Sequence, residues 1–327
     1  MAIEKTIPIN DTTMHIPVGI SACLLGQKVR YNGGHSRSKF CLNQLSQHFD
    51  FKTFCPEVVA GFGIPRPTMR LIGDPDNPKL VYSDNMDTDL TGQLTAGFKA
   101  HLDSLSQLDG YILMKNSPSC GMERIKIYQE SGYAHERRGQ GLFTQALIER
   151  YPLLPVEEEG RLHDPNLCEN FILRVFAFHR FRHEVLSKPS IHALLTFHSR
   201  YKYVVMAQNQ VYFRQLGQML STPHQKPLDV FLQDYLKLFM HALSKPATRK
   251  NHTHTLLHIL GYLKKTAPSE ARQHIADIIH RYRQELLPLI VPITLLRHYI
   301  DQTGNDYIRS QRYLQPYPDD LRLRNEI

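Results

Sequence analysis

The chain has 327 residues, of which 42% are hydrophobic, and its formal net charge is +8. This length exceeds what one hydrophobic core usually organises, and the apolar content excludes a disordered chain, so we expect two folded domains. The five cysteines, an odd number without paired spacings, argue against a secreted disulfide scaffold.

The chain begins with MAIEKTIPINDTT, in which no apolar stretch follows a basic start. We therefore expect no signal peptide. No apolar run in the sequence approaches the ~20 residues that a membrane helix needs. We expect a cytoplasmic protein with reduced thiols and no membrane partner.

Three short apolar stretches, each typical of a buried strand, lead into a turn that carries a cysteine. These cysteines are Cys23 after residues 15–22, Cys55 after residues 51–54, and Cys120 after residues 111–114 and a Ser/Pro-rich turn. If the three strands lie parallel in one sheet, their carboxyl ends meet at the edge where open α/β sheets bind ligands. Three converging thiols indicate a metal site.

Helix-like segments alternate with these strands. Residues 38–48, 89–108 and 144–150 have helical patterns, and Lys79–Tyr82 has the pattern of a short edge strand. This alternation predicts an α/β fold, with a parallel, helix-flanked sheet of the Rossmann-like kind. The sheet carries the expected metal site at its edge. A Pro- and Glu-rich break at residues 151–170 marks the boundary, so we assign residues 1–165 to the first domain and 166–327 to the second.

The second domain is expected to be all-α. Helical patterns cover residues 171–186, 190–220, 228–243, 248–265, 269–287 and 293–300. Residues 170–327 hold 22 Lys+Arg against 11 Asp+Glu, a net charge of +11, whereas residues 1–169 carry −3. This asymmetry favours a polyanionic partner for the helical half, with a merely soluble basic surface as the alternative.

The cysteine spacing matches neither a zinc knuckle nor a ferredoxin motif. Three thiolates on one face suit an iron–sulfur cluster with one open iron, and zinc with an open fourth position fits nearly as well. Three buried packing thiols are the plain alternative. Cys41, on a helix stripe, and Cys168, in the linker, are expected only to pack.

Two polar residues lie close in sequence to the expected ligands. Glu57 follows Cys55 by two residues, and Ser117 precedes Cys120 by three. A carboxylate there is placed to activate water, and a hydroxyl to hydrogen-bond a substrate heteroatom, so both are candidate catalytic residues. The candidate substrate-binding residues are Arg66, Lys115 and Ser119.

The first half resembles the thiouracil desulfidase (TudS) domain over about residues 15–160. The similarity lies in Ser21-Ala22-Cys23-Leu24-Leu25-Gly26, Val29-Arg30-Tyr31, Cys55-Pro56-Glu57, Pro65-Arg66 and Ser117-Pro118-Ser119-Cys120-Gly121. It implies a [4Fe-4S] cluster on the three cysteines, whose fourth iron takes the sulfur of a thiocarbonyl without net redox change. Glu57 and Ser117 fall where this family has its catalytic Glu and Ser. Asn32 departs from the pattern, because many relatives have Asp there.

The helical half resembles the YbgA-type domain that is often fused to this desulfidase, through residues 197–203, 261–264, 291–292 and 316–318. The combination is similar to the tRNA 4-thiouridine desulfidase (RudS) family, which implies removal of sulfur from 4-thiouridine in tRNA. Candidate RNA contacts, which interleave cations with aromatic rings, are His198, Tyr201, Lys202, His252, His254, Lys264 and Lys265. Two alternatives stay open, a desulfidase of free thiouracil or thiouridine nucleotides and a cluster-containing, RNA-binding redox sensor.

Overall fold

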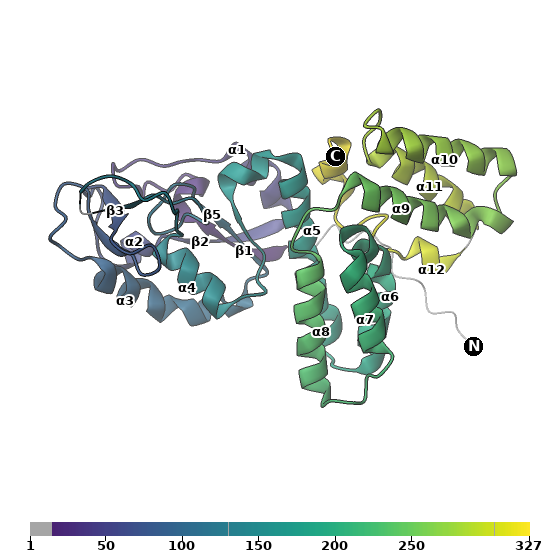
Figure 1. Ribbon diagram of the computed structural model, residues 1–327, viewed down its shortest axis with the longest axis horizontal. Helices are drawn as coiled ribbons and strands as arrows, with labels where there is room; N and C mark the ends of the chain where they lie inside the picture. Colours follow the sequence, from purple (N-terminus) through teal and green to yellow (C-terminus); the bar gives the residue numbers. More distant parts are fainter. Residues whose placement is uncertain (1–14, 130, 304) are drawn as a thin grey trace. The chain divides into compact units, whose positions relative to one another are not determined.

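The computed structural model describes residues 15–129, 131–303 and 305–327. The N-terminal segment, for which we expect no signal peptide, lies outside the described residues. The chain forms two compact units, of which the first ends at His163 and the second begins at Asp164 (Figure 1). Within the described ranges, no helix is long and apolar enough to cross a membrane.

The first unit is built on a four-stranded sheet in which every neighbouring pair is parallel. Its strand order is β2-β1-β5-β7. The strands are β1 (Ile16–Ser21), β2 (Phe49–Phe54), β5 (Gly110–Leu113) and β7 (Val156–Glu158). All of β5 and all but one residue of β1 are buried, as is usual for inner strands of a parallel sheet. The parallel α/β fold expected for the first domain is confirmed.

A second sheet of three strands has the order β4-β3-β6, formed by β3 (Met69–Ile72), β4 (Lys79–Tyr82) and β6 (Ile127–Tyr128). The sequence predicts β4 as an edge strand but does not predict β3, β6 or β7. These strands are two to four residues long, too short for an alternating pattern to develop. β7 lies inside the stretch that we interpret as the domain boundary.

Among the residues described, the α-helices of the first unit are α1 (Lys39–Asn43), α2 (Pro56–Val59), α3 (Thr91–Leu102) and α4 (Leu142–Arg150). The helix expected over residues 38–48 is wrong as one element, because α1 ends at Asn43 and a separate turn covers Leu45–Gln47. Phe143, at the start of α4, joins the layers of this unit. Its ring centroid lies 5.1 Å from Phe54 of β2, 5.6 Å from Phe98 of α3 and 5.6 Å from Tyr111 of β5.

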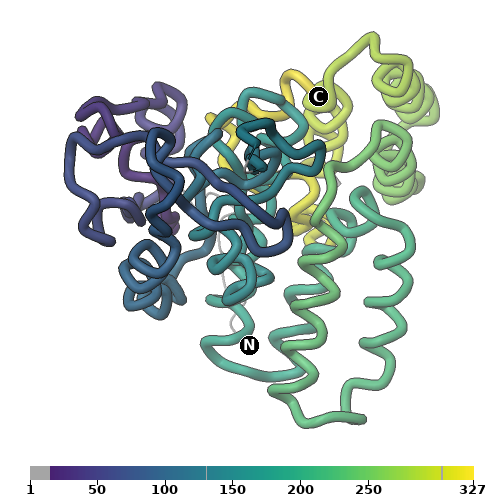
Figure 2. The backbone as a smooth tube through the Cα atoms, turned by 60° about the vertical axis from the view of Figure 1, so that its left-hand side comes forward, coloured from purple at the N-terminus to yellow at the C-terminus, as the bar shows by residue number. Residues whose placement is uncertain are grey.

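The second unit is helical, and its elements are α5 (Pro165–Phe181), α6 (Ile191–Gln208), α7 (Gln210–Leu220), α8 (Leu228–Ala242), α9 (Arg249–Leu260), α10 (Ser269–Arg283), α11 (Ile290–Thr303) and α12 (Asp306–Arg309). The single helix expected over residues 190–220 is wrong. Asn209 divides it, because its side chain accepts hydrogen bonds from the backbone N–H groups of Val211 and Tyr212 and caps α7. α7 and α8 then run side by side as a hairpin (Figure 2).

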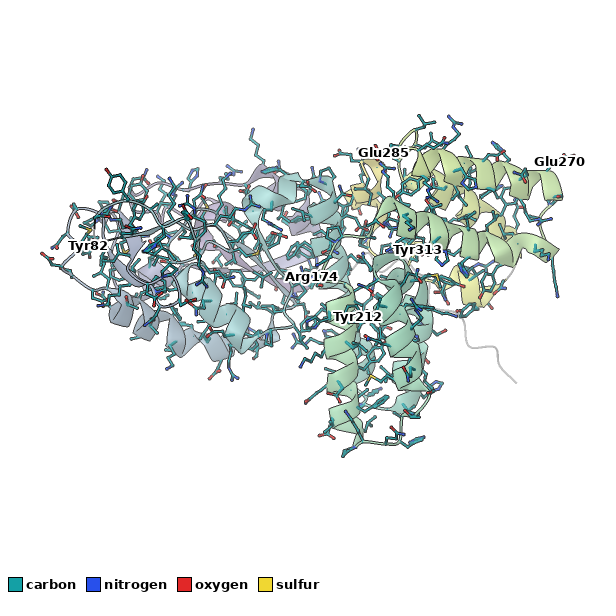
Figure 3. All side chains as sticks on the ribbon, viewed as in Figure 1. Tyr82, Arg174, Tyr212, Glu270, Glu285 and Tyr313 are labelled. Atoms are coloured by element: carbon teal, nitrogen blue, oxygen red, sulfur yellow. The ribbon has the colours of Figure 1, made fainter. Side chains whose placement is uncertain are left out.

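A buried polar network holds the C-terminal segment against α5. Arg324 pairs with Glu169 of α5 at 3.4 Å, and both side chains are at least nine-tenths buried. Tyr317 donates a hydrogen bond to the same Glu169 carboxylate at 2.8 Å. Tyr313, labelled in Figure 3, lies inside this unit, and its hydroxyl is 2.9 Å from Nδ1 of His252. The buried charges of Glu169 and Arg324 are therefore paired with each other, and Tyr317 adds a hydrogen bond to the carboxylate.

Candidate metal centre

The three cysteines of interest lie at the carboxyl ends of three adjacent strands. Cys23 is in the short turn Ala22–Leu25 after β1, Cys55 directly follows β2, and Cys120 lies in the turn after β5. β1 lies between the other two strands and pairs in parallel with both. All three cysteines line one pocket, together with Glu57, Arg66, Lys115 and Ser117 from the predicted site.

The turn that carries Cys120 is held by its own serine. Oγ of Ser117 accepts hydrogen bonds from the backbone N–H groups of Ser119, at 3.2 Å, and Cys120, at 3.0 Å. Because this oxygen already accepts twice, its own hydroxyl proton is free to be donated, and Ser117 lines the pocket.

The start of α4 packs against the turn that carries Cys120 and stabilises it by hydrogen bonds. Thr144 donates a hydrogen bond to the carbonyl oxygen of Cys120 at 2.8 Å, and the backbone N–H of Gly141 donates to the carbonyl of Gly121 at 2.8 Å. A Cβ atom at Gly141 would lie 2.5 Å from the backbone carbonyl of Ser119, so only glycine permits this approach. The position of the Cys120 sulfur is thus fixed by packing.

Cys23 and Cys120 are buried, Cys55 is half-buried, and the three thiols are close enough to repel one another once ionised. Burial, followed by the neighbouring Cys55, raises the pKa of Cys23 to about 11. Burial, Cys55 and Glu57 raise the pKa of the Cys120 thiol well above its ordinary value, and a hydrogen bond from Ser21 opposes them. Thiolates at these positions require a bound cationic group, which is the chemistry of a metal-ligand set.

The spacing of the sulfur atoms tests which group would fit. Among the residues that the structure describes, the three cysteine sulfurs do not all lie within 4.8 Å of one another. Thiolates bound tetrahedrally to one zinc ion, with bonds of about 2.3 Å, would be about 3.8 Å apart. The cysteines therefore fit a larger group gripped at three corners, such as an iron–sulfur cluster, better than a single ion.

Glu57, in α2, is held by both of its carboxylate oxygens. Oε1 accepts a hydrogen bond from the hydroxyl of Ser119 at 2.9 Å. Oε2 accepts from Nε of Arg66 at 2.9 Å and from its Nη2 at 2.5 Å. The carboxylate is thereby fixed on the pocket wall beside the cysteines, where it can orient a water molecule.

Two residues that the sequence predicts to bind substrate, Arg66 and Ser119, are hydrogen-bond partners of Glu57. Arg66 is buried, and it also donates to the carbonyls of Gly63 and Val29, so four of its five N–H donors are taken. Ser119 is fully buried and does not line the pocket. Both side chains position the carboxylate, while Lys115 is exposed at the pocket as a candidate substrate contact.

We expect Ser119→Ala to lower kcat by roughly 3- to 10-fold with little change in KM, because one hydrogen bond that orients Glu57 is lost. A positioning role predicts that the same change costs nothing further in a Glu57→Gln background, as a double-mutant cycle would measure. Ser38→Ala, which alters another buried serine that caps α1, is the control. A full additional loss in the double variant would contradict the role.

The sequence assigns no role to three residues that line the pocket. Ser21, at the end of β1, accepts a hydrogen bond from the backbone N–H of Met114 at 2.9 Å, which ties β1 to the end of β5. Arg30 and Tyr31 follow in the next turn, with the guanidinium carbon 5.8 Å from the ring centroid. The sequence feature that could have identified Arg30 and Tyr31 as pocket residues is the run Val29-Arg30-Tyr31, which is part of the resemblance to the thiouracil desulfidase domain. The neighbouring Asn32 accepts from the Gly34 N–H at 3.0 Å, a contact that Asp makes equally well.

Two of the candidate RNA contacts, Tyr201 and His252, are interior side chains, and a third, His198, is half-buried. Tyr201 is 1% exposed, and its ring stacks on that of Phe197 with centroids 4.4 Å apart. His252 is 4% exposed and bonded to Tyr313, and burial lowers its pKa to about 3. His198 lies 2.9 Å from the Tyr235 hydroxyl, and burial followed by Lys202 lowers its pKa to about 4, so it is neutral at pH 7. Tyr201 and His252 therefore present almost no surface to RNA, while RNA contact by the half-buried His198 stays a prediction.

The other candidates reach the surface on α6, α9 and the turn after α9. Lys264, Lys265 and His254 are exposed, and Lys202 is half-buried. Burial, then His254, then Lys202 lower the pKa of His258, whose ring centroid is 4.6 Å from that of His254, so these groups are neighbours. The hydroxyl of Tyr262 lies 3.1 Å from that of Tyr203 on α6, which places the Lys264–Lys265 turn beside that helix. We call Lys202, His254, Lys264 and Lys265 the α6–α9 patch.

The sheet, the converging thiols and the fixed carboxylate define an α/β protein with a cysteine-lined metal centre beside an acid–base group. Residues 18–159 match the family model described as 2-thiouracil desulfurase. The chain belongs to the 2-thiouracil desulfurase family. Residues 202–318 match a second model, described as a protein of unknown function (DUF1722).

Individual proteins match each part of this architecture. The uncharacterized protein YbgA of Escherichia coli (strain K12) is 33% identical over 161 residues, which are 48% of this chain and 94% of YbgA. The uncharacterized protein YbbK of Bacillus subtilis (strain 168) is 32% identical over 138 residues, 40% of this chain and 88% of YbbK. A solved [4Fe-4S]-dependent thiouracil desulfidase, TudS, is 31% identical and covers 49% of this chain and 99% of its own, with a TM-score of 0.37. The expected fusion of a thiouracil desulfidase domain to a YbgA-type domain is confirmed.

Proposed function

We propose that this protein removes sulfur from 4-thiouridine in tRNA, giving uridine, at a [4Fe-4S] cluster held by Cys23, Cys55 and Cys120. The observation that carries the proposal is the convergence of these three thiols, two of them buried and one half-buried, beside Glu57 in a 2-thiouracil desulfurase domain. A [4Fe-4S] cluster is also the cofactor for which the similar TudS is named. All five cysteines are free thiols, in keeping with a cytoplasmic site of action.

When bound, a cluster with one open iron supplies a Lewis acid for the thiocarbonyl sulfur, which makes C4 of the base electrophilic. Glu57, held by Arg66 and Ser119, orients a water molecule and takes its proton as the oxygen attacks C4. Ser117 donates a hydrogen bond from its hydroxyl group to the nucleobase or to the departing sulfur, and both hydrogens of the sulfide come from the water. The C–O bond forms as the C–S bond breaks. Water is consumed and hydrogen sulfide is produced, so no oxidant or reductant is needed.

Folded tRNA as the substrate accounts for the charge of the second unit. A 4-thiouridine in tRNA is stacked, and an enzyme that acts on its C4 must draw the base out at a cost of a few kcal/mol. The first half of the chain, at −3, attracts a phosphate backbone poorly, whereas residues 170–327, at +11, can gain affinity through counterion release. The exposed lysines of the α6–α9 patch are the groups that we expect to meet the backbone.

The direct experiment uses anaerobically purified protein with a counted iron content and tRNA that contains 4-thiouridine. After treatment, the tRNA is digested to nucleosides, and we expect 4-thiouridine to be replaced by uridine. Turnover of free thiouracil or 4-thiouridine nucleotides without turnover of tRNA would favour the free-substrate alternative. An intact cluster and RNA binding without any turnover would favour a redox sensor.

We expect the triple variant Lys202→Gln/Lys264→Gln/Lys265→Gln to bind all tRNAs more weakly and to reduce the slope of log affinity against log salt by about 2 to 3, close to one per lost phosphate contact. Its iron content should equal that of the parent. The measurement is tRNA binding between about 50 and 200 mM salt. A control triple at Lys188, Lys237 and Lys245, which are exposed on other segments of the same unit, should keep the parental slope. Equal slopes for both triples would place the RNA elsewhere.

A further inference from the structure

A buried tyrosine near the metal centre has a hydroxyl group that the chain leaves without a hydrogen bond. Tyr111 is the second residue of β5 and is 0% exposed. Among the residues that the structure describes, its hydroxyl oxygen has no hydrogen-bond partner. Buried hydroxyl groups nearly always have one, because leaving such a group unpaired costs free energy. Phenylalanine would fill the same space without this cost, so the hydroxyl group needs an explanation beyond packing.

The ring of Tyr111 is packed so tightly that the direction of its hydroxyl group is fixed. β1 and β5 pair with Tyr111 opposite Gly19, and a Cβ atom at Gly19 would be 2.3 Å from Cδ2 and 2.4 Å from Cε2 of the ring. Glycine at this position therefore lets the ring lie across β1. Phe143 packs on the ring, with the two centroids 5.6 Å apart. Because the hydroxyl oxygen lies on the ring axis, this packing also holds the oxygen in place.

The position of the ring brings the hydroxyl group close to the three cysteines. The ring lies over β1, the strand between β2 and β5, and the ends of these three strands carry Cys23, Cys55 and Cys120. Burial raises the pKa of Tyr111 well above its ordinary value, and Cys120, then Cys55, then Cys23 raise it further, so all three thiols act on this phenol. Tyr111 does not line the pocket. It therefore approaches the cysteines from the interior of the unit, not from the side where a substrate would enter.

We propose that the Tyr111 hydroxyl group donates a hydrogen bond to a sulfur atom of the [4Fe-4S] cluster or of its Cys120 ligand. This proposal rests on the proposed function, because it takes the three converging cysteines as the cluster ligands. Sulfur in these positions carries negative charge, and a donated hydrogen bond withdraws electron density from it. The hydrogen bond therefore stabilises the reduced cluster more than the oxidised one. It also leaves the open iron a stronger Lewis acid toward a thiocarbonyl sulfur.

Tyr111→Phe removes only the hydroxyl group, and the reduction potential of the cluster is the readout. Parent and variant are matched for iron content under anaerobic conditions and titrated spectroelectrochemically. At equal applied potential we expect the ratio of reduced to oxidised cluster to be about tenfold lower in the variant, as for one hydrogen bond to a charged group. For a one-electron couple, this tenfold change is a downward shift of about 59 mV.

Tyr151→Phe is the matched control in the same unit. The Tyr151 hydroxyl group donates to the carbonyl oxygen of Leu102 at 2.8 Å, and Tyr151 does not line the pocket. Its loss removes a hydrogen bond without removing one to sulfur, so the potential should equal that of the parent. A downward shift of the same size in both variants would assign the effect to general loosening of the fold and overturn the proposal.

A second change at position 111 should shift the potential in the opposite direction. Fluorotyrosine in place of Tyr111 keeps the ring and makes its hydroxyl group more acidic and a stronger donor, so the potential should rise above that of the parent. This rise supports the hydrogen bond even if Tyr111→Phe fails to hold a cluster. A potential equal to the parent's in every variant at position 111 that holds the cluster would overturn the proposal.

These potentials are measured without turnover, so the two proposals can fail separately. A parent protein that binds no iron would overturn the ligand assignment and the role of Tyr111 together. A full cluster whose potential responds to Tyr111, in a protein that desulfurates no thiobase, would support the hydrogen bond and contradict the proposed function alone.

Discussion

Alanine at Cys23, Cys55 or Cys120 should each give a protein that retains little iron and has no desulfidase activity. Each thiol comes from a different strand end, and two thiolates cannot hold a cluster that is gripped at three corners. The measurement is an anaerobic iron and sulfide count with an absorption spectrum for each variant. Iron content is the decisive readout, since inactivity alone has many causes.

The remaining two cysteines provide the control. Cys41 on α1 and Cys168 on α5 are buried and do not line the pocket. Cys41→Ala and Cys168→Ala should therefore keep parental iron and activity, with at most a modest loss of stability from the smaller side chain. Full iron content in any one of the three ligand variants would contradict the assignment of Cys23, Cys55 and Cys120 as cluster ligands.

Glu57→Gln should keep full iron content while kcat falls by roughly 10²-fold or more, the usual scale of general acid–base catalysis. Glutamine retains the shape of the side chain. Its amide oxygen can still face Arg66 and its NH₂ group can face the Ser119 oxygen, so the pocket geometry is preserved while the base is lost. Single-turnover rates with iron-matched samples measure the effect.

A matched carboxylate elsewhere in the first unit tests whether the loss is specific. Glu149 is exposed on α4 and does not line the pocket, so Glu149→Gln should turn over at the parental rate. Parental turnover by Glu57→Gln would mean that another group activates the water.

The strand ends could be predicted from sequence because the relevant neighbours are close along the chain. A buried strand followed by a turn and a cysteine is a local pattern, and parallel pairing then brings the three ends together. Glu57 and Ser117 could be predicted for the same reason, since each lies within three residues of an expected ligand. The contact between Glu57 and Ser119 could not be predicted in this way, because the two residues are 62 positions apart and only the fold brings them together.

In the helical unit, the sequence pattern alone does not determine which side chains reach the surface. A run such as Phe197–Lys202, which alternates aromatic rings and cations, is compatible with an RNA-binding surface and with an amphipathic helix. Only the packing in the structure shows which of these side chains face the core and which face the solvent. Tyr201 faces the core with Phe197, whereas Lys202 reaches the surface beside His258. The break at Asn209 was missed because helix-compatible residues lie on both sides of it, although Asn is a common capping residue.

The strand order also determines when the metal centre can first exist during synthesis. β1 and β2 carry two of the ligands, but the third arrives with β5, whose pairing with β1 joins residues about 90 positions apart, such as Ser21 and Met114. At roughly 5–20 residues per second, the ribosome needs about 3 to 13 s to proceed from Cys55 to Cys120. For those seconds the emerging chain carries two of its three expected ligand thiols unshielded, and distant pairings of this kind also form slowly. Cluster loading therefore follows folding of the first unit, and the nascent chain is most vulnerable to oxidants before β5 has joined the sheet.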